Sequence, residues 1–408
     1  MTSTQSPTRT LVWAACLCLA GSLFGAVFAA YSTSDYTAHL DRQVHAVHCS
    51  FIPGATVDGA ESNPCKVALF SPYSALFRQT YWGGIPISLA ALGCFSFSAA
   101  LGLYLLLARS RAPRGAIVLL GVTGFVPLMA SIVMFGISLT QLHAFCKVCV
   151  GIYASSALVA AAAFMSWRAR HQPGRMMLVL AVGVVTLGIA SLLPAVVYAA
   201  SMPDYRPYLR TCGTLAHETE PHNALVKIAT SSPKRQALLF EDPLCPTCKA
   251  FHERLVSEGM FERLDVTLAL FPLDTDCNWM LDRSLHPGAC VLSKAVMCGK
   301  DRARQVLEWA YDNQEDLRPL GKQGGSALKD RVGKQFGSDV ATCIDDKATG
   351  ARLNQMLQFA ATNHVPISTP QMYIGAQAGE KKLMRVCDED TDLGLKYAMA
   401  QLAPEVLP

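Results

Sequence analysis

The stretch FCKVCVGIYASSALVAAAAFMSW, residues 145–167, decides most about how this chain folds. It opens with a Cys-x-x-Cys pair, Cys146 and Cys149, and continues as an uncharged apolar run from Val150 to Trp167. A bilayer span needs about 20 such residues, and closely spaced cysteine pairs are redox or metal-binding units. The sequence therefore places a dithiol at the mouth of a membrane helix. There it can exchange electrons with a lipid-soluble carrier on one side and with protein thiols on the other.

The composition indicates a membrane protein with a soluble part attached. Of the 408 residues 51% are hydrophobic and 16% are charged, whereas soluble domains carry about 25% charged residues. Uncharged stretches long enough to cross a bilayer occupy Leu11–Tyr31, Ile85–Ala108, Gly115–Leu142, Val148–Trp167 and Met176–Met202. The first lacks a clear signal-peptide cleavage site, so we expect a retained helix. After Met202 charges become frequent and no further window is apolar enough to span.

The arginines predict how the chain is oriented, because loops on the cytoplasmic side carry an excess of Lys and Arg. One side of the predicted bundle carries arginines and no acids, at positions 9, 109, 111, 114, 168, 170 and 175. We therefore expect a multi-pass protein of the cytoplasmic (inner) membrane with a cytoplasmic N-terminus. Residues 32–84, the Cys146/Cys149 mouth and everything after Met202 then lie outside, in the periplasm or its equivalent.

The fifteen cysteines agree with this orientation. Twelve fall on the predicted external side, as expected where disulfides form and persist, and Cys16, Cys18 and Cys94 are interpreted as small helix-packing residues. Between the first two spans, the loop carries Cys49 and Cys65, and the run 66–76 after it is predicted to be a short surface helix. The net charge of +4 comes with no basic stripe, so nucleic acid is not an expected partner.

A second Cys-x-x-Cys pair follows a predicted buried strand, Gln236–Glu241, and opens a predicted helix, Lys249–Ser257. This layout is typical of thioredoxin-like domains. A helix N-terminus stabilises a thiolate, so Cys245 is the predicted attacking sulfur and Cys248 the resolving thiol. A zinc site needs two more ligands at suitable spacing. His252 is near, but no second cysteine pair joins it, and we predict a redox site without metal.

Thr369-Pro370 is predicted to be a cis proline that faces the dithiol and lets Thr369 pair with an extended substrate chain. The alternative is an ordinary trans proline that starts a strand. The gap of 120 residues between Cys248 and Thr369 is too long for a bare thioredoxin core and implies a helical insertion. Further strands are predicted at 264–271, 371–374 and 382–386, and further helices at 291–312, 352–363 and 393–402.

Six external cysteines remain, and an even number in an exported domain indicates structural disulfides. Six cysteines allow fifteen connectivities. Cys277–Cys290 is favoured because it closes a short loop in the inserted region, and Cys298–Cys343 with Cys212–Cys387 are left by elimination.

Two family resemblances rest on these motifs. Residues 1–170 resemble the vitamin K epoxide reductase family through the segment 145–153, through Cys65 followed six residues later by Ser71 in a Phe-Ser-Pro-Tyr setting, and through the Gly-Ile-Pro-Ile run at 84–87. The remainder resembles the thioredoxin-like domain that bacterial members carry as a fusion, through the motifs at 242–248 and 368–370. The resemblance implies an all-α four-helix membrane bundle (1–170), a fifth transmembrane helix with a linker (171–205), and an α/β thioredoxin-like domain with a helical insertion (206–408).

The resemblance also implies a relay of thiols. Cys149 would react with a quinone, Cys146 would pair with Cys65, Cys65 would shuttle between Cys146 and Cys49, and Cys49 would exchange with Cys245. Cys49 and Cys65 are sixteen residues apart, wider than is usual in the family.

Ser71 and Tyr153 match positions that line the quinone pocket of the family, although Tyr153 is also a natural core residue. Thr369 and Pro370 would bind substrate. The expected activity is a quinone-dependent thiol:disulfide oxidoreductase that oxidises reduced exported proteins and passes electrons to the membrane quinone pool, ubiquinone or menaquinone. The alternatives are reduction of vitamin K epoxide itself and a membrane-anchored disulfide isomerase.

Overall fold

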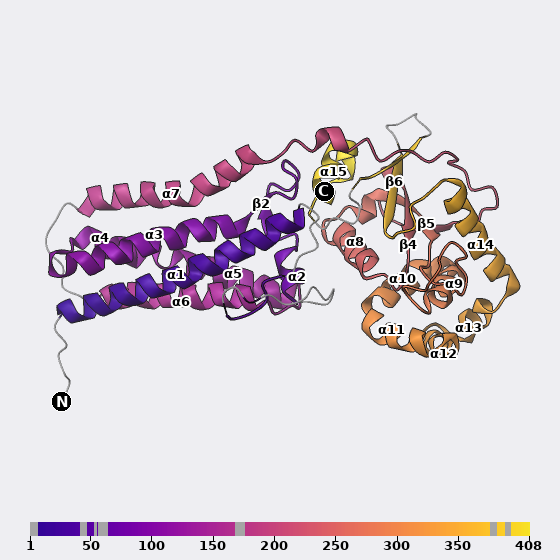
Figure 1. The fold of residues 1–408 in the computed structure, drawn as a ribbon, viewed down its shortest axis with the longest axis horizontal. Helices are drawn as coiled ribbons and strands as arrows, with labels where there is room; N and C mark the ends of the chain where they lie inside the picture. Colours follow the sequence, from indigo (N-terminus) through magenta and orange to yellow (C-terminus); the bar gives the residue numbers. More distant parts are fainter. Residues whose placement is uncertain are drawn as a thin grey trace. The chain divides into compact units, whose positions relative to one another are not determined.

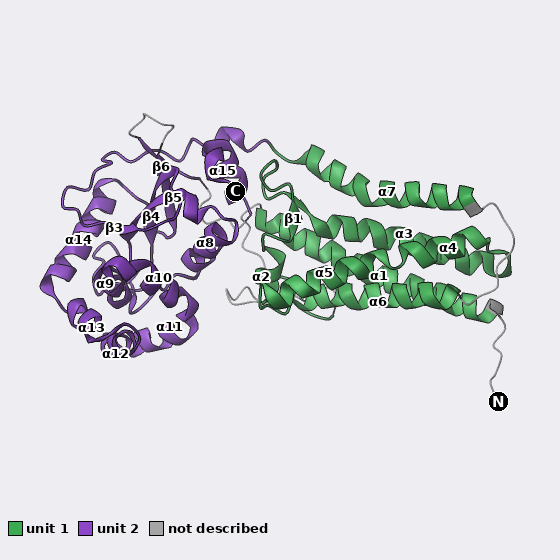
Figure 2. Ribbon diagram, turned by 180° about the vertical axis from the view of Figure 1, so that it is seen from behind, with its two compact units in different colours: residues 1–203 green, residues 204–408 purple. Residues whose placement is uncertain are grey.

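The structure is a computed structural model, and it describes residues 7–40, 47–52, 55, 64–167, 176–375, 382–387 and 393–408. The chain forms two compact units, Met1–Pro203 and Asp204–Pro408 (Figure 2). The division falls directly after the last long apolar helix. The turn that follows Trp167, on which part of the arginine argument rests, lies outside the described residues.

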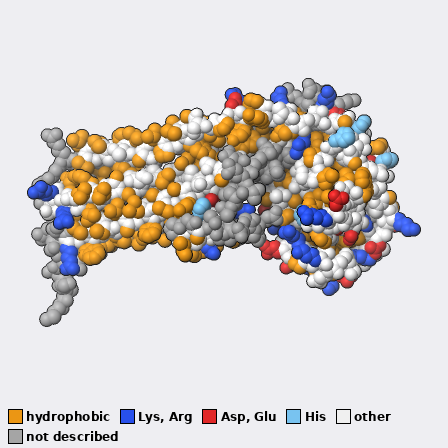
Figure 3. Space-filling view, viewed as in Figure 1, with side chains coloured by type: hydrophobic (Ala, Val, Ile, Leu, Met, Phe, Trp, Pro, Cys, Tyr) orange, Lys and Arg blue, Asp and Glu red, His pale blue; other side chains and the backbone are white. Residues whose placement is uncertain are grey.

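Long apolar helices build unit 1 (Figure 1). They are α1 (Pro7–Leu40), α3 (Ile87–Ala108), α4 (Arg114–Thr123), α5 (Val126–Thr140), α6 (Lys147–Trp167) and α7 (Met176–Ser201). With α4 and α5 taken together, they supply five spans long and apolar enough to cross a membrane, as predicted. Apolar side chains cover the sides of these helices, and basic side chains gather at one end (Figure 3).

The third span differs from the prediction, because the run Gly115–Leu142 forms two helices rather than one. The break falls at Gly124, where the chain passes so close to α6 that an added Cβ would lie 2.8 Å from the Cβ of Ala163. Pro127 follows at the start of α5. Proline fits the first turn of a helix but not its interior, so it marks where a new helix begins.

Helix α1 packs against both α3 and α6, and α7 packs against α3 and α4. A buried apolar cluster joins these helices, formed by Leu11, Ala15, Cys18, Phe95, Leu101, Leu105, Ile117, Leu120, Val159 and Ala163. Helix α7 meets α3 at Gly93, where a Cβ would collide with the backbone of Ala190. Most other side chains of α7 are exposed in the described chain, as expected for a helix that faces lipid.

The segment after Cys65 is shorter as a helix than predicted. Helix α2 covers only Pro64–Leu69, so the expectation of a helix over residues 66–76 is wrong beyond Leu69. The sequence there continues Ser71-Pro72, and a proline disfavours the helical conformation of the residue before it. The chain turns instead and forms a short hairpin in which β1 (Ala75–Leu76) pairs with β2 (Ile85–Pro86).

Unit 2 is built on a five-stranded sheet with the order β3-β5-β4-β6-β7. The strands are β3 (Val226–Ile228), β4 (Arg235–Glu241), β5 (Leu264–Leu270), β6 (Gln371–Gly375) and β7 (Leu383–Arg385). Parallel strands β4 and β5 are joined through α8 (Pro246–Ser257), and antiparallel strands β6 and β7 are followed by α15 (Leu395–Leu402). This βαβ unit followed by a ββα unit is the thioredoxin-like fold, which confirms the predicted fold class.

A helical insertion separates β5 from β6, as the long gap between the motifs predicted. It contains α9 (Ala289–Cys298), α10 (Ala303–Asp312), α11 (Gln314–Gln323), α12 (Gly325–Phe336), α13 (Ser338–Ile344) and α14 (Lys347–Thr362). The single helix predicted over residues 291–312 is wrong. The chain breaks at Gly299-Lys300, where Lys300 has a φ of 51°, a left-handed conformation that interrupts an α-helix.

Three disulfides fasten unit 2, and all three predicted pairs form: Cys212–Cys387, Cys277–Cys290 and Cys298–Cys343. The first ties the segment before β3 to the residues after β7, and the other two lie within the insertion or at its start. The insertion is thereby cross-linked at both a short loop and a long one.

Candidate active sites at three cysteine pairs

The cysteine pair of unit 2 lies where β4 ends and α8 begins. Cys245 occupies the N-cap of α8 with an extended backbone, and Pro246 follows as the first helical residue. A proline suits this position because its missing N–H has no partner inside the helix. Cys248 lies one turn further on, fully buried, and the backbone N–H of Asp242 points to its Sγ at 3.5 Å.

The surroundings shift the pKa values of the two thiols in opposite directions. A hydrogen bond from Cys248, helped by one from Thr247, lowers the pKa of Cys245 to about 6 against the effect of burial. Burial, together with the neighbouring Cys245, raises the pKa of Cys248 well above the ordinary value. Since the thiolate is the reactive form of cysteine, this geometry suits Cys245 as the attacked or attacking sulfur and Cys248 as the thiol that keeps its proton.

Thr369-Pro370 lies beside this dithiol. The peptide bond between the two residues is cis, as predicted. The carbonyl oxygen of Thr369 lies 3.6 Å from Cys245 Sγ and accepts a hydrogen bond from the Thr247 hydroxyl at 3.1 Å. The motifs at 245–248 and 369–370 therefore come together at one place, although more than a hundred residues separate them in the sequence.

A buried aspartate–histidine pair adjoins Cys245 and was missed in the sequence. Asp242, three residues before Cys245, is 0% exposed. Its Oδ2 accepts a hydrogen bond from Nδ1 of His286 at 2.8 Å. Burial alone lowers the pKa of His286, but the hydrogen bond and the charge of Asp242 outweigh it and the pKa is raised. The two partners are 44 residues apart in the sequence, so no local sequence motif indicated the pair.

Beneath Cys248, a second acid is buried. Burial raises the pKa of Glu241, and the Tyr311 hydroxyl donates a hydrogen bond to its Oε2 at 2.9 Å. The charge of Glu241 is one of the causes that raise the pKa of Cys248.

In unit 1, Cys146 and Cys149 stand at the start of α6. Cys146 directly precedes the helix and is buried, and Cys149 lies in its first turn, partly buried. The backbone N–H of Cys149 donates a hydrogen bond to Cys146 Sγ at 3.2 Å. The pair therefore has one sulfur that accepts a helix N-terminal N–H and a second sulfur one turn along the same helix.

The loop cysteines Cys49 and Cys65 form a disulfide, with their Cα atoms 5.8 Å apart. Helix α2, which carries Cys65, contacts α6. His48, directly before Cys49, is bound by Asp35 of α1 through two hydrogen bonds, from its backbone N–H at 2.9 Å and with its Nδ1 at 2.7 Å. The same carboxylate is near enough to Cys146 for its charge to act on that thiol. Asp35 and His48 were also missed in the sequence.

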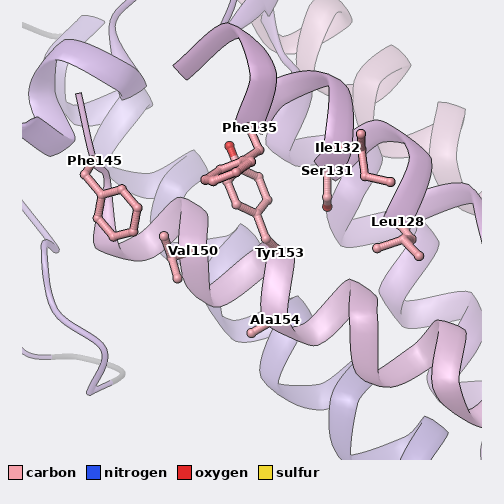
Figure 4. A pocket seen from close by; sticks show the side chains of 8 residues that line it. All are labelled: Leu128, Ser131, Ile132, Phe135, Phe145, Val150, Tyr153 and Ala154. Atoms are coloured by element: carbon pink, nitrogen blue, oxygen red, sulfur yellow. The ribbon is translucent and has the colours of Figure 1, made fainter. Parts of the chain in front are cut away.

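A cavity of about 340 Å³ lies beside α5 and the first turns of α6 (Figure 4). Its walls are almost entirely apolar and are formed by Leu128, Ser131, Ile132, Phe135, Phe145, Val150, Tyr153 and Ala154. Tyr153 meets Phe135 edge to face, with ring centroids 5.8 Å apart. Of the two predicted pocket residues only Tyr153 lines this cavity. Ser71 is buried elsewhere, with its hydroxyl donating to the carbonyl of Ala68.

The described part of the chain holds no group of three or more His, Cys, Asp or Glu side chains that fits a metal ion.

Comparison with known proteins gives one family match and distant structural likenesses. Residues 16–164 match the vitamin K epoxide reductase family, whereas no curated protein matches the chain. Reduced DsbA1 from Neisseria meningitidis is 17% identical with a TM-score of 0.30, covering 44% of this chain and 92% of its own. The oxidoreductase NmDsbA1 from the same species is 16% identical with a TM-score of 0.30, covering 45% of this chain and 91% of its own. Likeness at this level adds nothing to what the sheet order itself shows.

Proposed function

We propose that this chain, whose residues 16–164 match the vitamin K epoxide reductase family, makes disulfides in exported proteins and passes the electrons to a membrane quinone. The observation that carries the proposal is the joint presence of three cysteine pairs in one chain. One pair opens a membrane helix, one is a disulfide on the adjoining loop, and one is the dithiol of a thioredoxin-like unit.

Electrons are proposed to pass from pair to pair. Two substrate thiols become a disulfide as the Cys245–Cys248 disulfide is reduced. The Cys49–Cys65 disulfide then reoxidises that dithiol, and the resulting loop dithiol reduces a Cys146–Cys149 disulfide. In each step one disulfide breaks as another forms, so two electrons and two protons move together. The final dithiol gives both to the quinone, which leaves as the quinol.

The cavity beside α6 supports the choice of a quinone as the last acceptor. Ligand cavities typically enclose about 300–1,000 Å³ with mostly apolar walls, and this one has both properties. It lies next to Val150, the residue after Cys149. Several of its lining side chains are exposed, among them Ile132 on α5 and Phe145 just before α6, so an apolar molecule can enter from the bilayer. A quinone supplies a two-electron, two-proton sink when it is bound here.

The proposed orientation follows from the arginines. With the arginine-bearing end in the cytoplasm, the N-terminus is cytoplasmic and all three cysteine pairs face the extracytoplasmic side, in contact with exported proteins. The proposed domain limits, 1–170, 171–205 and 206–408, then separate the membrane bundle, the connecting helix and the thioredoxin-like unit.

Single cysteine-to-alanine substitutions in the full chain, reconstituted with ubiquinone or menaquinone, test the proposal. Cys149→Ala is expected to abolish quinol formation driven by a reduced peptide, and to leave a mixed disulfide at Cys146. Cys16→Ala, a cysteine within α1, is the matched control and should retain the wild-type rate. Quinol formation at the wild-type rate by Cys149→Ala would overturn the relay. Turnover of vitamin K epoxide without peptide oxidation would favour the epoxide reductase alternative. Isomerisation of peptide disulfides in the absence of any quinone would favour the membrane-anchored isomerase.

A further inference from the structure

We propose that His286 is a positioning residue for the dithiol of unit 2: bound to Asp242, it cancels the charge of that buried carboxylate and favours the thiolate of Cys245. The proposal rests on the proposed function in one respect, that Cys245 exchanges disulfides with substrates. It assigns a purpose to the loop between β5 and α9, which brings His286 to the dithiol.

Asp242 is placed where an uncompensated charge would harm the chemistry. It is fully buried and belongs to the turn that leads from β4 to Cys245. Its Oδ1 accepts the N–H of Leu244 at 2.7 Å and its Oδ2 the N–H of Leu273 at 2.8 Å. These bonds keep the turn in shape, but the negative charge of Asp242 acts against a thiolate at Cys245. A carboxylate is thus needed for the fold of the turn, and its charge opposes the reaction.

His286 supplies the compensating charge. Its side chain is 11% exposed and its Nδ1 lies 2.8 Å from Asp242 Oδ2. Three charged or titratable groups act on it: Asp242, Cys245, and Arg318 of α11, whose positive charge opposes protonation. Asp242 and Cys245 both favour the imidazolium and together prevail over Arg318 and burial. The Cys245 thiolate and the His286 imidazolium therefore stabilise one another, while the Asp242 carboxylate both holds His286 and keeps the turn in shape.

The loop that carries His286 is held firmly enough for this role. The backbone N–H of His286 donates to the carbonyl of Leu273 at 3.0 Å. Asp274 accepts hydrogen bonds from the N–H of Gly288 at 2.8 Å and from the hydroxyl of Ser284 at 2.9 Å. The Cys277–Cys290 disulfide closes the same loop. A ring held by its own backbone, by a buried carboxylate and by a cross-linked loop has little freedom to leave Cys245.

The chemical effect falls on the step in which Cys245 departs. A substrate thiolate first attacks Cys245 Sγ, so that a substrate–Cys245 bond forms and the Cys245–Cys248 bond breaks, with Cys248 taking a proton. A second substrate thiolate then attacks the substrate sulfur, the substrate disulfide forms, and Cys245 leaves with the electron pair as a thiolate. A leaving thiolate of lower pKa departs faster, so His286 accelerates release of the oxidised substrate.

The test compares His286→Gln with His286→Lys in the full-length protein, with His222→Gln as the control at an exposed histidine of the same unit. Two quantities are measured: the pH midpoint for alkylation of Cys245, read by peptide mass spectrometry, and the equilibrium of the Cys245–Cys248 pair with glutathione. In His286→Gln we expect the midpoint to rise by about one pH unit and the equilibrium to move about tenfold toward the disulfide, equal to about 30 mV. Lysine should restore the equilibrium.

A double variant guards against simple misfolding. If His286 acts by cancelling Asp242, Asp242→Asn combined with His286→Gln should return the midpoint toward the wild-type value. An unchanged midpoint and equilibrium in His286→Gln overturns the proposal, as does a double variant shifted as far as the single one. A wild-type protein that forms no mixed disulfide through Cys245, yet shows the His286-dependent midpoint, refutes the proposed function and leaves the assignment of His286 standing.

Discussion

Replacing Asp35 by alanine should detach the loop that carries Cys49 from the membrane bundle. Asp35 is 2% exposed on α1 and binds the residue before Cys49 through two hydrogen bonds. Tyr31, one turn earlier on the same helix, stacks on the ring of His48 with centroids 4.3 Å apart. In the alanine variant the stacking remains and both hydrogen bonds are lost, so the change isolates the contribution of the carboxylate.

The expected magnitude follows from those two bonds. A hydrogen bond to a charged group contributes about 1.5–3 kcal/mol. The His48 side chain is 21% exposed, so water replaces part of what is lost and the lower value applies. Two bonds then give about 3 kcal/mol, or about a hundredfold fewer molecules with the loop held in place. Asp35→Asn, which keeps an oxygen for the backbone N–H, should lose about tenfold.

The assay is multiple-turnover quinol formation by the full-length protein driven by a reduced peptide, since every turnover after the first requires transfer from the loop pair to Cys146 and Cys149. Asp204→Ala, at an exposed aspartate of unit 2, is the matched control. A double-mutant cycle with His48→Ala separates a direct effect from a general one, because partners in contact are not additive. A variant Asp35→Ala as fast as Asp204→Ala would refute the reasoning, and so would additive losses in the cycle.

Three further predictions concern other parts of the molecule. Gly93→Leu should release α7 from α3, because a Cβ at that position collides with the Ala190 backbone. Faster proteolysis of the chain after α7 would report the release, and Gly188→Leu, on the open side of α7, is the control. Cys277→Ala with Cys290→Ala should lower the free energy of unfolding of unit 2 by about 3 kcal/mol, as expected for a loop of this size, and raise the alkylation midpoint of Cys245. The pKa of His286 is raised in the fold. The contribution of His286 to the stability of unit 2 is therefore complete below pH about 6.5 and is lost as the pH rises through the raised pKa. Chemical denaturation across this range should show a fall in the free energy of unfolding of the wild-type protein, and His286→Gln should lack this fall.

Local patterns in the sequence were enough to predict the spans, the thioredoxin-like core and the Cys277–Cys290 disulfide, and elimination then gave the other two disulfides. An uncharged run of 20 or more residues has few alternatives to a membrane helix, and a strand followed by Cys-x-x-Cys at a helix start is equally restrictive. The prediction failed where distant residues decide the backbone. The break at Gly124 depends on α6 passing close by, and helices α11 to α13 of the insertion were not predicted, because Pro319 and the Gly324-Gly325 pair weaken their helical pattern.

In the candidate sites, too, residues within a local motif were predicted, and pairs formed only in the fold were not. The cysteines of the proposed relay were predicted from their spacing, their placement in the chain and the family resemblance. The aspartate–histidine pairs beside the cysteines were missed, because aspartate and histidine are common and their pairing is visible only in the fold. Tyr153 was found through a family resemblance, whereas Ser131 and Phe135 of the same cavity lie on α5 and carry no motif.

The two missed pairs share one construction, and it has a physical reason. In each unit a buried aspartate, Asp35 on α1 or Asp242 after β4, binds Nδ1 of a histidine that a loop brings beside a cysteine of the proposed relay. A ring N–H can donate to a carboxylate both in neutral histidine and in the imidazolium, so the loop stays in place in either protonation state. At His286 position and charge are thereby separated: the hydrogen bond to Asp242 fixes where the ring lies, while the proton on the other ring nitrogen can follow the thiol chemistry proposed for Cys245. A lysine in the same place would hold the loop but would keep its charge through the whole cycle, which is why histidine suits a site whose neighbouring sulfur alternates between thiolate and disulfide.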